Sequence, residues 1–109
     1  MSKKGLAGLL LVAVALMGAA GNAQATQPGC YIFNEPEWEG EGRYLQPNTR
    51  YDRLDRFRRS VKSVMLSIGC RLDVYEREDF NGPRHEFDED RKRVGAWETK
   101  IESLNCRCE

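Results

Sequence analysis

Apolar and polar residues alternate over short stretches of the chain, and turn-forming residues separate these stretches. Residues 31–33 and 72–75 are short runs rich in aromatic and β-branched side chains, which is typical of strands. Residues 60–68 and 100–106 show the alternation of half-buried strands. The pattern therefore predicts an all-β protein, with glycine, proline and asparagine at the turns. These turn residues are Pro36, Gly40, Gly42, Pro47, Asn48, Asn81, Gly82 and Pro83.

The segment 49–60 fits the strand pattern less well. Leu54, Phe57 and Val61 follow one another at spacings of three and four residues, which a helix places on one face. We expect this segment to be either irregular or a short helix.

One spacing of residues occurs twice along the chain. In "IFNEPEWEG" and in "VYEREDFNG" an aromatic residue is followed by another aromatic five positions later and by glycine two positions after that. The offset between the copies is 42 residues up to Leu45 and 40 residues from Leu54 onward, so the first copy carries two extra residues in its middle. The chain therefore has an internal repeat. The matched pairs are Phe33 with Tyr75, Trp38 with Phe80, Gly40 with Gly82, Leu45 with Phe87, Leu54 with Val94, Phe57 with Trp97, Val61 with Ile101, Ser63 with Ser103, and Val64 with Leu104.

The repeated spacing has a physical interpretation. A short hairpin folds back onto its own sheet, and the two aromatic side chains cover the fold from either side of the bend. The glycine adopts a positive φ that a side chain would penalise, and the serine near the end of each unit hydrogen-bonds the folded hairpin. Two such units packed face to face bury their apolar faces.

The repeat resembles the βγ-crystallin Greek-key motif. The resemblance covers Cys30 to Cys106 and implies an eight-stranded sandwich of two Greek keys, with the first motif over about 30–69 and the second over about 70–109. It also implies a non-catalytic structural or binding role. The alternative that it suggests is a small secreted proteinase inhibitor, or a killer-toxin-like protein, of the same fold.

Many microbial members of this family bind calcium through a six-residue signature rich in oxygen ligands, which are the ligands that Ca²⁺ requires. In the first unit the matching positions, 58–63, place Arg58, Arg59 and Lys62 where oxygen ligands belong. In the second unit, at 98–103, the acidic pair of the signature is missing. The weak candidate ligands that remain are Glu98, Thr99 and Glu102, so we expect no calcium site and no cofactor.

The start of the chain predicts export. Two lysines precede an apolar run over 6–17, which is short for a membrane span, and Ala23-Gln24-Ala25 is a cleavage pattern of the A-x-A type. A signal peptide over 1–25 fits better than the alternative of an anchoring helix. We therefore expect a single mature domain, residues 26–109, that is secreted or periplasmic and has no membrane insertion after cleavage.

All four cysteines fall in the expected mature chain. An even number of cysteines in a small exported domain indicates structural disulfides, in preference to a redox pair at Cys106 and Cys108. A bond between those two residues would close a strained ring. Two pairings remain open, and each joins Cys30 and Cys70 separately to the C-terminal cysteines.

Charge and candidate chemistry argue against catalysis. Cleavage of the signal peptide would remove Lys3 and Lys4 and leave fifteen basic and seventeen acidic residues. Because the mature chain then has no excess of positive charge, we expect no nucleic-acid partner. His85 has no identifiable catalytic partner, and the cysteines do not match a zinc spacing. We expect no enzyme and an unknown protein partner.

Two charged stretches, residues 34–41 and 50–62, are interpreted as solvated surfaces whose charges pair across the molecule. The alternative for the second is an arginine-rich surface for an acidic partner. If the partner is a secreted peptidase, the longer middle of the first unit, Leu45 to Leu54, is the candidate inhibitory loop.

Overall fold

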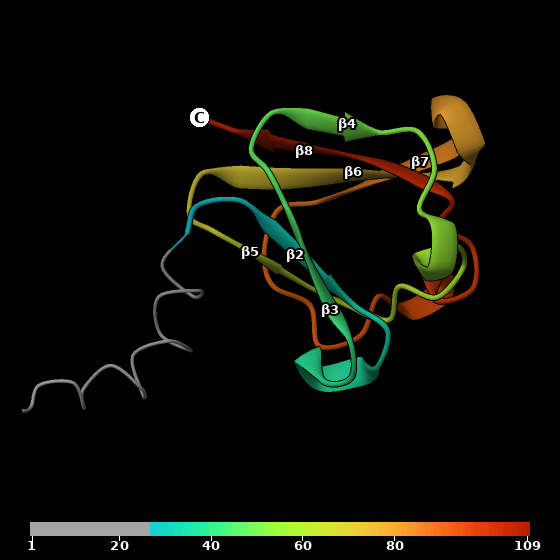
Figure 1. Cartoon of the computed structure of the whole chain (residues 1–109), viewed down its shortest axis with the longest axis horizontal. Coiled ribbons are helices and arrows are strands. Elements are labelled where there is room, and N and C mark those ends of the chain that lie inside the picture. The colour runs from blue at the N-terminus through green and yellow to red at the C-terminus, as the bar shows by residue number, and fades with distance from the viewer. Residues whose placement is uncertain (1–26) are drawn as a thin grey trace, which may run out of the picture.

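The computed structural model describes residues 27–109, and in this part of the chain seven strands form two antiparallel sheets (Figure 1). The expected signal peptide lies outside the described residues. One sheet has the order β3-β2-β5 and the other the order β4-β8-β6-β7. The strands are β2 (Cys30–Phe33), β3 (Gly42–Leu45), β4 (Thr49–Tyr51), β5 (Ser63–Leu66), β6 (Cys70–Arg77), β7 (Asn81–Phe87) and β8 (Ser103–Cys108).

Short 3-10 helices form the connections between several of these strands. The segment expected to be irregular or a short helix contains β4, which was not predicted, followed by a single 3-10 turn, so the short helix is confined to that turn. Leu54, Phe57 and Val61 are nevertheless all buried. Within residues 27–109, no helix is long and apolar enough to cross a membrane. The 3-10 helices are η2 (Pro36–Trp38), η3 (Asp55–Phe57), η4 (Glu78–Phe80) and η5 (Gly95–Trp97).

The two units exchange one strand each. β4 belongs to the first unit but pairs with β8 of the second, with Thr49 opposite Cys106. In the other direction, Arg91 of the second unit forms a single β-bridge with Val64 of β5 in the first unit. Seven of the eight expected strands are therefore present in the described residues, and the eighth is reduced to one bridge. Residues 88–93 are all charged and have low strand propensity, which accounts for the reduction of the eighth strand to one bridge.

The core lies between the two sheets, as the alternation along the strands requires. In β2, Cys30 and Ile32 are fully buried while Tyr31 and Phe33 face outward and are half-buried. In β6, Leu72 and Val74 point inward. Because side chains alternate between the faces of a strand, each sheet keeps an outer face of its own, and these outer faces carry the features described next.

Candidate functional site

Each hairpin is closed by a buried serine from the last strand of its unit. The Ser63 hydroxyl accepts a hydrogen bond from the Trp38 backbone N–H at 3.0 Å and donates to the Glu35 carbonyl at 2.7 Å. Ser103 makes the same two bonds in the second unit, accepting from Phe80 N–H at 3.0 Å and donating to the Arg77 carbonyl at 2.6 Å. Both serines have no exposed surface. The same two bonds therefore hold both hairpins over their sheets.

The tip of each hairpin has a left-handed backbone. Gly40 and Gly82 have φ of 75° and 81°. Two consecutive residues before each glycine also have positive φ: Glu37 and Trp38 in the first unit, and Asp79 and Phe80 in the second. Positive φ at non-glycine residues costs energy. The spacing of aromatics and glycine located the bend but did not indicate this wider left-handed segment.

The paired aromatic residues cover the two hairpins differently. In the second unit, the Tyr75 and Phe80 rings meet edge to face with centroids 5.5 Å apart. The Arg50 guanidinium lies over the Phe80 ring, 4.0 Å from the ring centroid. In the first unit, Trp38 instead donates its indole N–H to the Val64 carbonyl at 2.9 Å.

The positions that match the calcium signature pair with one another across the two units. Glu102, whose side chain is 6% exposed, forms ion pairs with Arg58 at 3.3 Å and with Arg59. Lys62 lies 3.5 Å from Glu98. The hydrogen bond from Arg59 is the main cause that lowers the pKa of Glu102. Two of the three weak calcium candidates therefore already bind cations of this chain, and the third, Thr99, is exposed.

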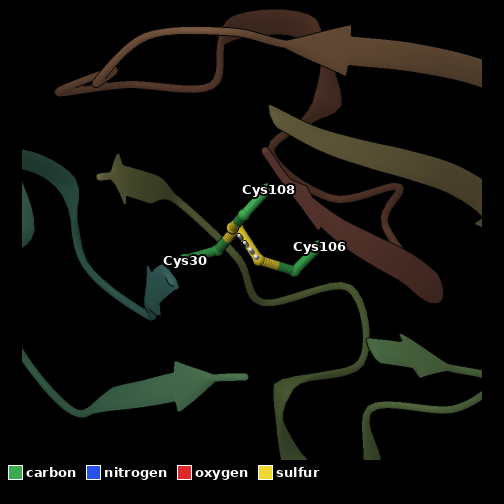
Figure 2. Close-up of side chains that lie close together, drawn as sticks. All are labelled: Cys30, Cys106 and Cys108. Carbon is green, nitrogen blue, oxygen red and sulfur yellow. Dashed lines mark hydrogen bonds between the residues drawn. A yellow bond between two sulfur atoms is a disulfide. The ribbon is translucent and has the colours of Figure 1, made fainter. Parts of the chain in front are cut away.

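Two disulfides select one of the two pairings that the sequence left open. Cys30 of β2 is bonded to Cys106 of β8, which joins the two sheets, and Cys70 is bonded to Cys108. Cys70 and Cys108 are direct neighbours in the register of β6 and β8. The Cys106 and Cys108 sulfurs lie 3.8 Å apart, and Figure 2 shows them next to each other. Both belong to disulfides, so this sulfur cluster offers no thiolate to a metal.

Many charges of the two charged stretches pair within the molecule. Arg56 binds Glu41 of the acidic hairpin, and the cations at 58, 59 and 62 bind the second unit as described above. The candidate inhibitory loop contains strand β4, and its tip is held at Asn48, whose side chain accepts a hydrogen bond from Cys108 N–H at 2.9 Å. The expectation of a protruding loop over Leu45 to Leu54 is therefore wrong, because β4 pairs with β8.

His85 lies exposed on β7. Its ring contacts Phe87 edge to face and stacks on Trp97, with centroid distances of 4.7 and 5.9 Å. No hydrogen bond or ion pair joins the imidazole to another residue within 27–109.

Sequence reasoning did not single out the groove on the outer face of the three-stranded sheet. The groove has a volume of about 710 Å³, which is within the usual range for small-molecule sites. The signal for it was available in the strand alternation, which places Tyr31, Phe33, Tyr44 and Met65 on the outward face. We call it the aromatic groove; the lining residues that matter below are Tyr31, Phe33, Tyr44, Met65, Ile68 and Asp90.

Comparison of the sequence with family models and with curated proteins finds no match. Solved structures are similar in fold. A βγ-crystallin domain from Clostridium beijerinckii superposes with a TM-score of 0.65 at 22% identity, covering 72% of this chain and 97% of that one. A βγ-crystallin domain from Flavobacterium johnsoniae gives a TM-score of 0.67 at 16% identity, covering 73% and 94%. The N-terminal domain of protein S gives 0.65 at 15% identity, covering 73% and 96%.

These similarities establish the fold of the described residues. They span almost the whole length of the matched domains, so both Greek-key units are included. The prediction of a βγ-crystallin-like sandwich from the doubled spacing is confirmed. At these identities the likeness concerns the fold alone, and the role of the chain has to be argued from its own residues.

Proposed function

We propose that this chain is an exported, non-catalytic βγ-crystallin-like domain that acts as a structural or binding protein. The observation that carries the proposal is the pair of disulfides, which tie β2 and β6 to the same strand, β8. Disulfides persist in oxidising compartments, and on the chain-entropy model bonds that close loops of 76 and 38 residues add roughly 4–5 kcal/mol each. A small domain stapled in this way suits the exterior of a cell.

The distribution of polar groups supports a binding role over catalysis. The buried carboxylates Asp73 and Glu102 are each held by two arginines. Asp73 binds Arg107 at 2.7 Å and Arg84 at 3.4 Å. These arginines occupy the carboxylate oxygens, whereas a general acid or base must be available to a substrate. The hydrogen bond that Arg107 donates to Asp73 also raises the pKa of Arg107, so this guanidinium remains charged.

Expression of the full chain in a bacterial host with an oxidising periplasm tests the export part of the proposal. We expect the purified protein to begin at Thr26 and to contain no free thiol. Non-reducing peptide mapping should recover Cys30 linked to Cys106 and Cys70 linked to Cys108. An uncleaved protein with four free thiols in the cytoplasmic fraction would contradict the proposal.

Affinity capture tests the binding part. Mature oxidised protein is immobilised and exposed to the envelope and medium of the producing organism, and a reduced, alkylated sample serves as the control for surface chemistry. A saturable partner that is retained by the oxidised protein alone supports a binding role. If no partner is retained, the binding of a macromolecular partner is contradicted.

The peptidase-inhibitor alternative requires a separate assay. A panel of secreted metallo- and serine peptidases is incubated with micromolar oxidised protein. Inhibition near one-to-one stoichiometry would favour the alternative, and full activity of the whole panel would remove it.

A further inference from the structure

We propose that the aromatic groove binds an organic cation, such as a quaternary ammonium group or a protonated alkylamine. The inference rests on the binding role proposed above and gives it a ligand class. It comes from three features of the groove: the aromatic side chains, a carboxylate without an ion pair, and hydroxyl groups whose protons are already donated.

The first feature is the aromatic lining. Tyr31 of β2 and Tyr44 of β3 are opposite each other in register, and their ring centroids lie 5.2 Å apart. Phe33 follows on the same outward face of β2, opposite Gly42, which carries no side chain. Met65 lies on the other side of Tyr31. Aromatic faces attract cations through the ring quadrupole, and apolar methyl groups of a ligand also fit such a surface.

The second feature is the charge at the groove. Asp90 lies at its edge, where one carboxylate oxygen accepts a hydrogen bond from the Leu66 backbone N–H at 2.7 Å. This bond fixes the carboxylate, and no residue within 27–109 forms an ion pair with it. Arg43 also lines the groove, but it pairs in register with the buried Ile32. Its guanidinium lies over the Tyr51 ring, 5.2 Å from the centroid, and is thus directed away from the outer face.

The third feature is the use of the hydroxyl protons. The Tyr44 hydroxyl donates to the Pro28 carbonyl at 2.6 Å, and the Tyr31 hydroxyl donates to the Gln27 carbonyl at 3.1 Å. The Ser67 hydroxyl donates to the Gln27 carbonyl as well. An anion would therefore compete with three existing bonds for hydroxyl donors. These bonds also hold both tyrosine rings in place before a ligand arrives, which reduces the entropy cost of binding.

A pair of probes with the same shape tests the charge requirement. Choline and its uncharged carbon isostere, 3,3-dimethylbutan-1-ol, are titrated separately into mature oxidised protein at low salt, and binding is followed by the NMR resonances of the Tyr31 and Tyr44 rings. We expect choline to bind saturably and at least about fivefold more tightly than the alcohol. Equal affinity for the two probes, or no saturable shift with choline, would overturn the proposal.

Matched variants assign the effect to the groove. Asp90→Asn keeps an oxygen to accept the Leu66 N–H bond but removes the charge, so choline binding should weaken several-fold while binding of the alcohol stays unchanged. Asp79→Asn, an exposed carboxylate on the other hairpin, is the control and should leave both probes unaffected. Tyr44→Leu should weaken choline binding, whereas Tyr44→Phe, which keeps the ring, should retain most of it.

The two proposals fail in distinguishable ways. If choline does not bind but affinity capture recovers a partner, the binding role stands and the cation site is wrong. If choline binds with the expected dependence on Asp90 and capture recovers nothing, the site stands and its natural ligand is a small molecule. If Asp90→Asn binds choline as tightly as the unaltered protein, the carboxylate has no part in recognition and the proposed ligand class is wrong.

Discussion

The Ser103 hydroxyl lies 3.0 Å from the backbone nitrogen of Phe80 and closes the second hairpin onto strand β8. Ser63 and Trp38 stand in the same relationship in the first unit, also at 3.0 Å. In both units the serine is fully buried, and its hydroxyl satisfies a backbone donor and a backbone acceptor at once. In each unit the serine side chain therefore joins the hairpin to the sheet that it covers.

Replacing either serine should destabilise the protein by about 1–3 kcal/mol, because Ser63→Ala or Ser103→Ala leaves a partly buried N–H and a carbonyl without this partner. Denaturant midpoints of the oxidised variants measure the effect. Ser60→Ala is the control: this hydroxyl makes a local bond to the Arg58 carbonyl near the surface, and its loss should change stability by less than about 0.5 kcal/mol. Two buried-serine variants as stable as the control would show that the hairpins do not depend on these bonds.

The glycines at the hairpin tips should differ in their tolerance of substitution. Gly82→Val should lower the free energy of unfolding by about 1–3 kcal/mol, because valine is strained at this positive φ. Gly40→Val should cost more, because a Cβ there would lie 2.3 Å from Asn34 Oδ1 and 2.4 Å from Glu35 Cγ. Gly95 has φ of 67°, and a Cβ at this position would meet no atom within 4 Å, so Gly95→Val isolates backbone strain from crowding. Urea denaturation of the three variants ranks their losses of unfolding free energy. A Gly40→Val protein that is as stable as the Gly95→Val protein would contradict the crowding argument.

Calcium should not stabilise the protein. Glu102 and Glu98 are held by Arg58, Arg59 and Lys62, and a calcium ion would have to displace these cations. A ligand at a hundred times its Kd adds about 2.7 kcal/mol of stability, which a thermal melt detects easily. We expect the same Tm in millimolar calcium and in chelator. A saturable rise of several degrees that the chelator reverses would show that a site remains.

Stability should fall in acid in a way that depends on Glu102. Its pKa is lowered in the folded protein, whereas the pKa of a glutamate in an unfolded chain is about 4.3. The folded state then binds fewer protons than the unfolded state in this range, so the stabilisation is present above about pH 4.3 and is lost as the pH falls through the lower folded pKa. Thermal melts of the unaltered protein and Glu102→Gln should differ at neutral pH and converge in acid.

The matched control for this pH dependence is Glu78→Gln. Glu78 lies 4.0 Å from Arg58 and its side chain is 39% exposed, so its ion pair contributes little. Its Tm profile should follow that of the unaltered protein from neutral to acid pH. A Glu102→Gln profile that stays parallel to the unaltered protein down to about pH 3 would mean that another group causes the acid sensitivity.

The repeat, the hairpins and the buried strands were determined by local features of the sequence. Gly40 and Gly82 stand where a bend needs positive φ, and a bend of this kind depends on a few consecutive residues. Ser63 and Ser103 recur at similar distances from their aromatic partners, because each unit folds onto itself over a short stretch of chain. Spacing of this type is visible along the chain without knowledge of how the units meet.

The tertiary structure alone decided the features that depend on how distant strands align. Cys30 of β2 is bonded to Cys106 of β8 across the two sheets, with Cα atoms 6.0 Å apart, whereas both remaining pairings were compatible with the spacing of the cysteines. β4 pairs with β8 of the other unit instead of forming part of the expected loop. Arg59 binds Glu102, which lies 43 positions away in the sequence. The aromatic groove likewise forms where Tyr31, Tyr44 and Asp90 come from three separate segments. Such contacts depend on strand register and on the packing of one sheet against the other, which no local pattern of residues encodes.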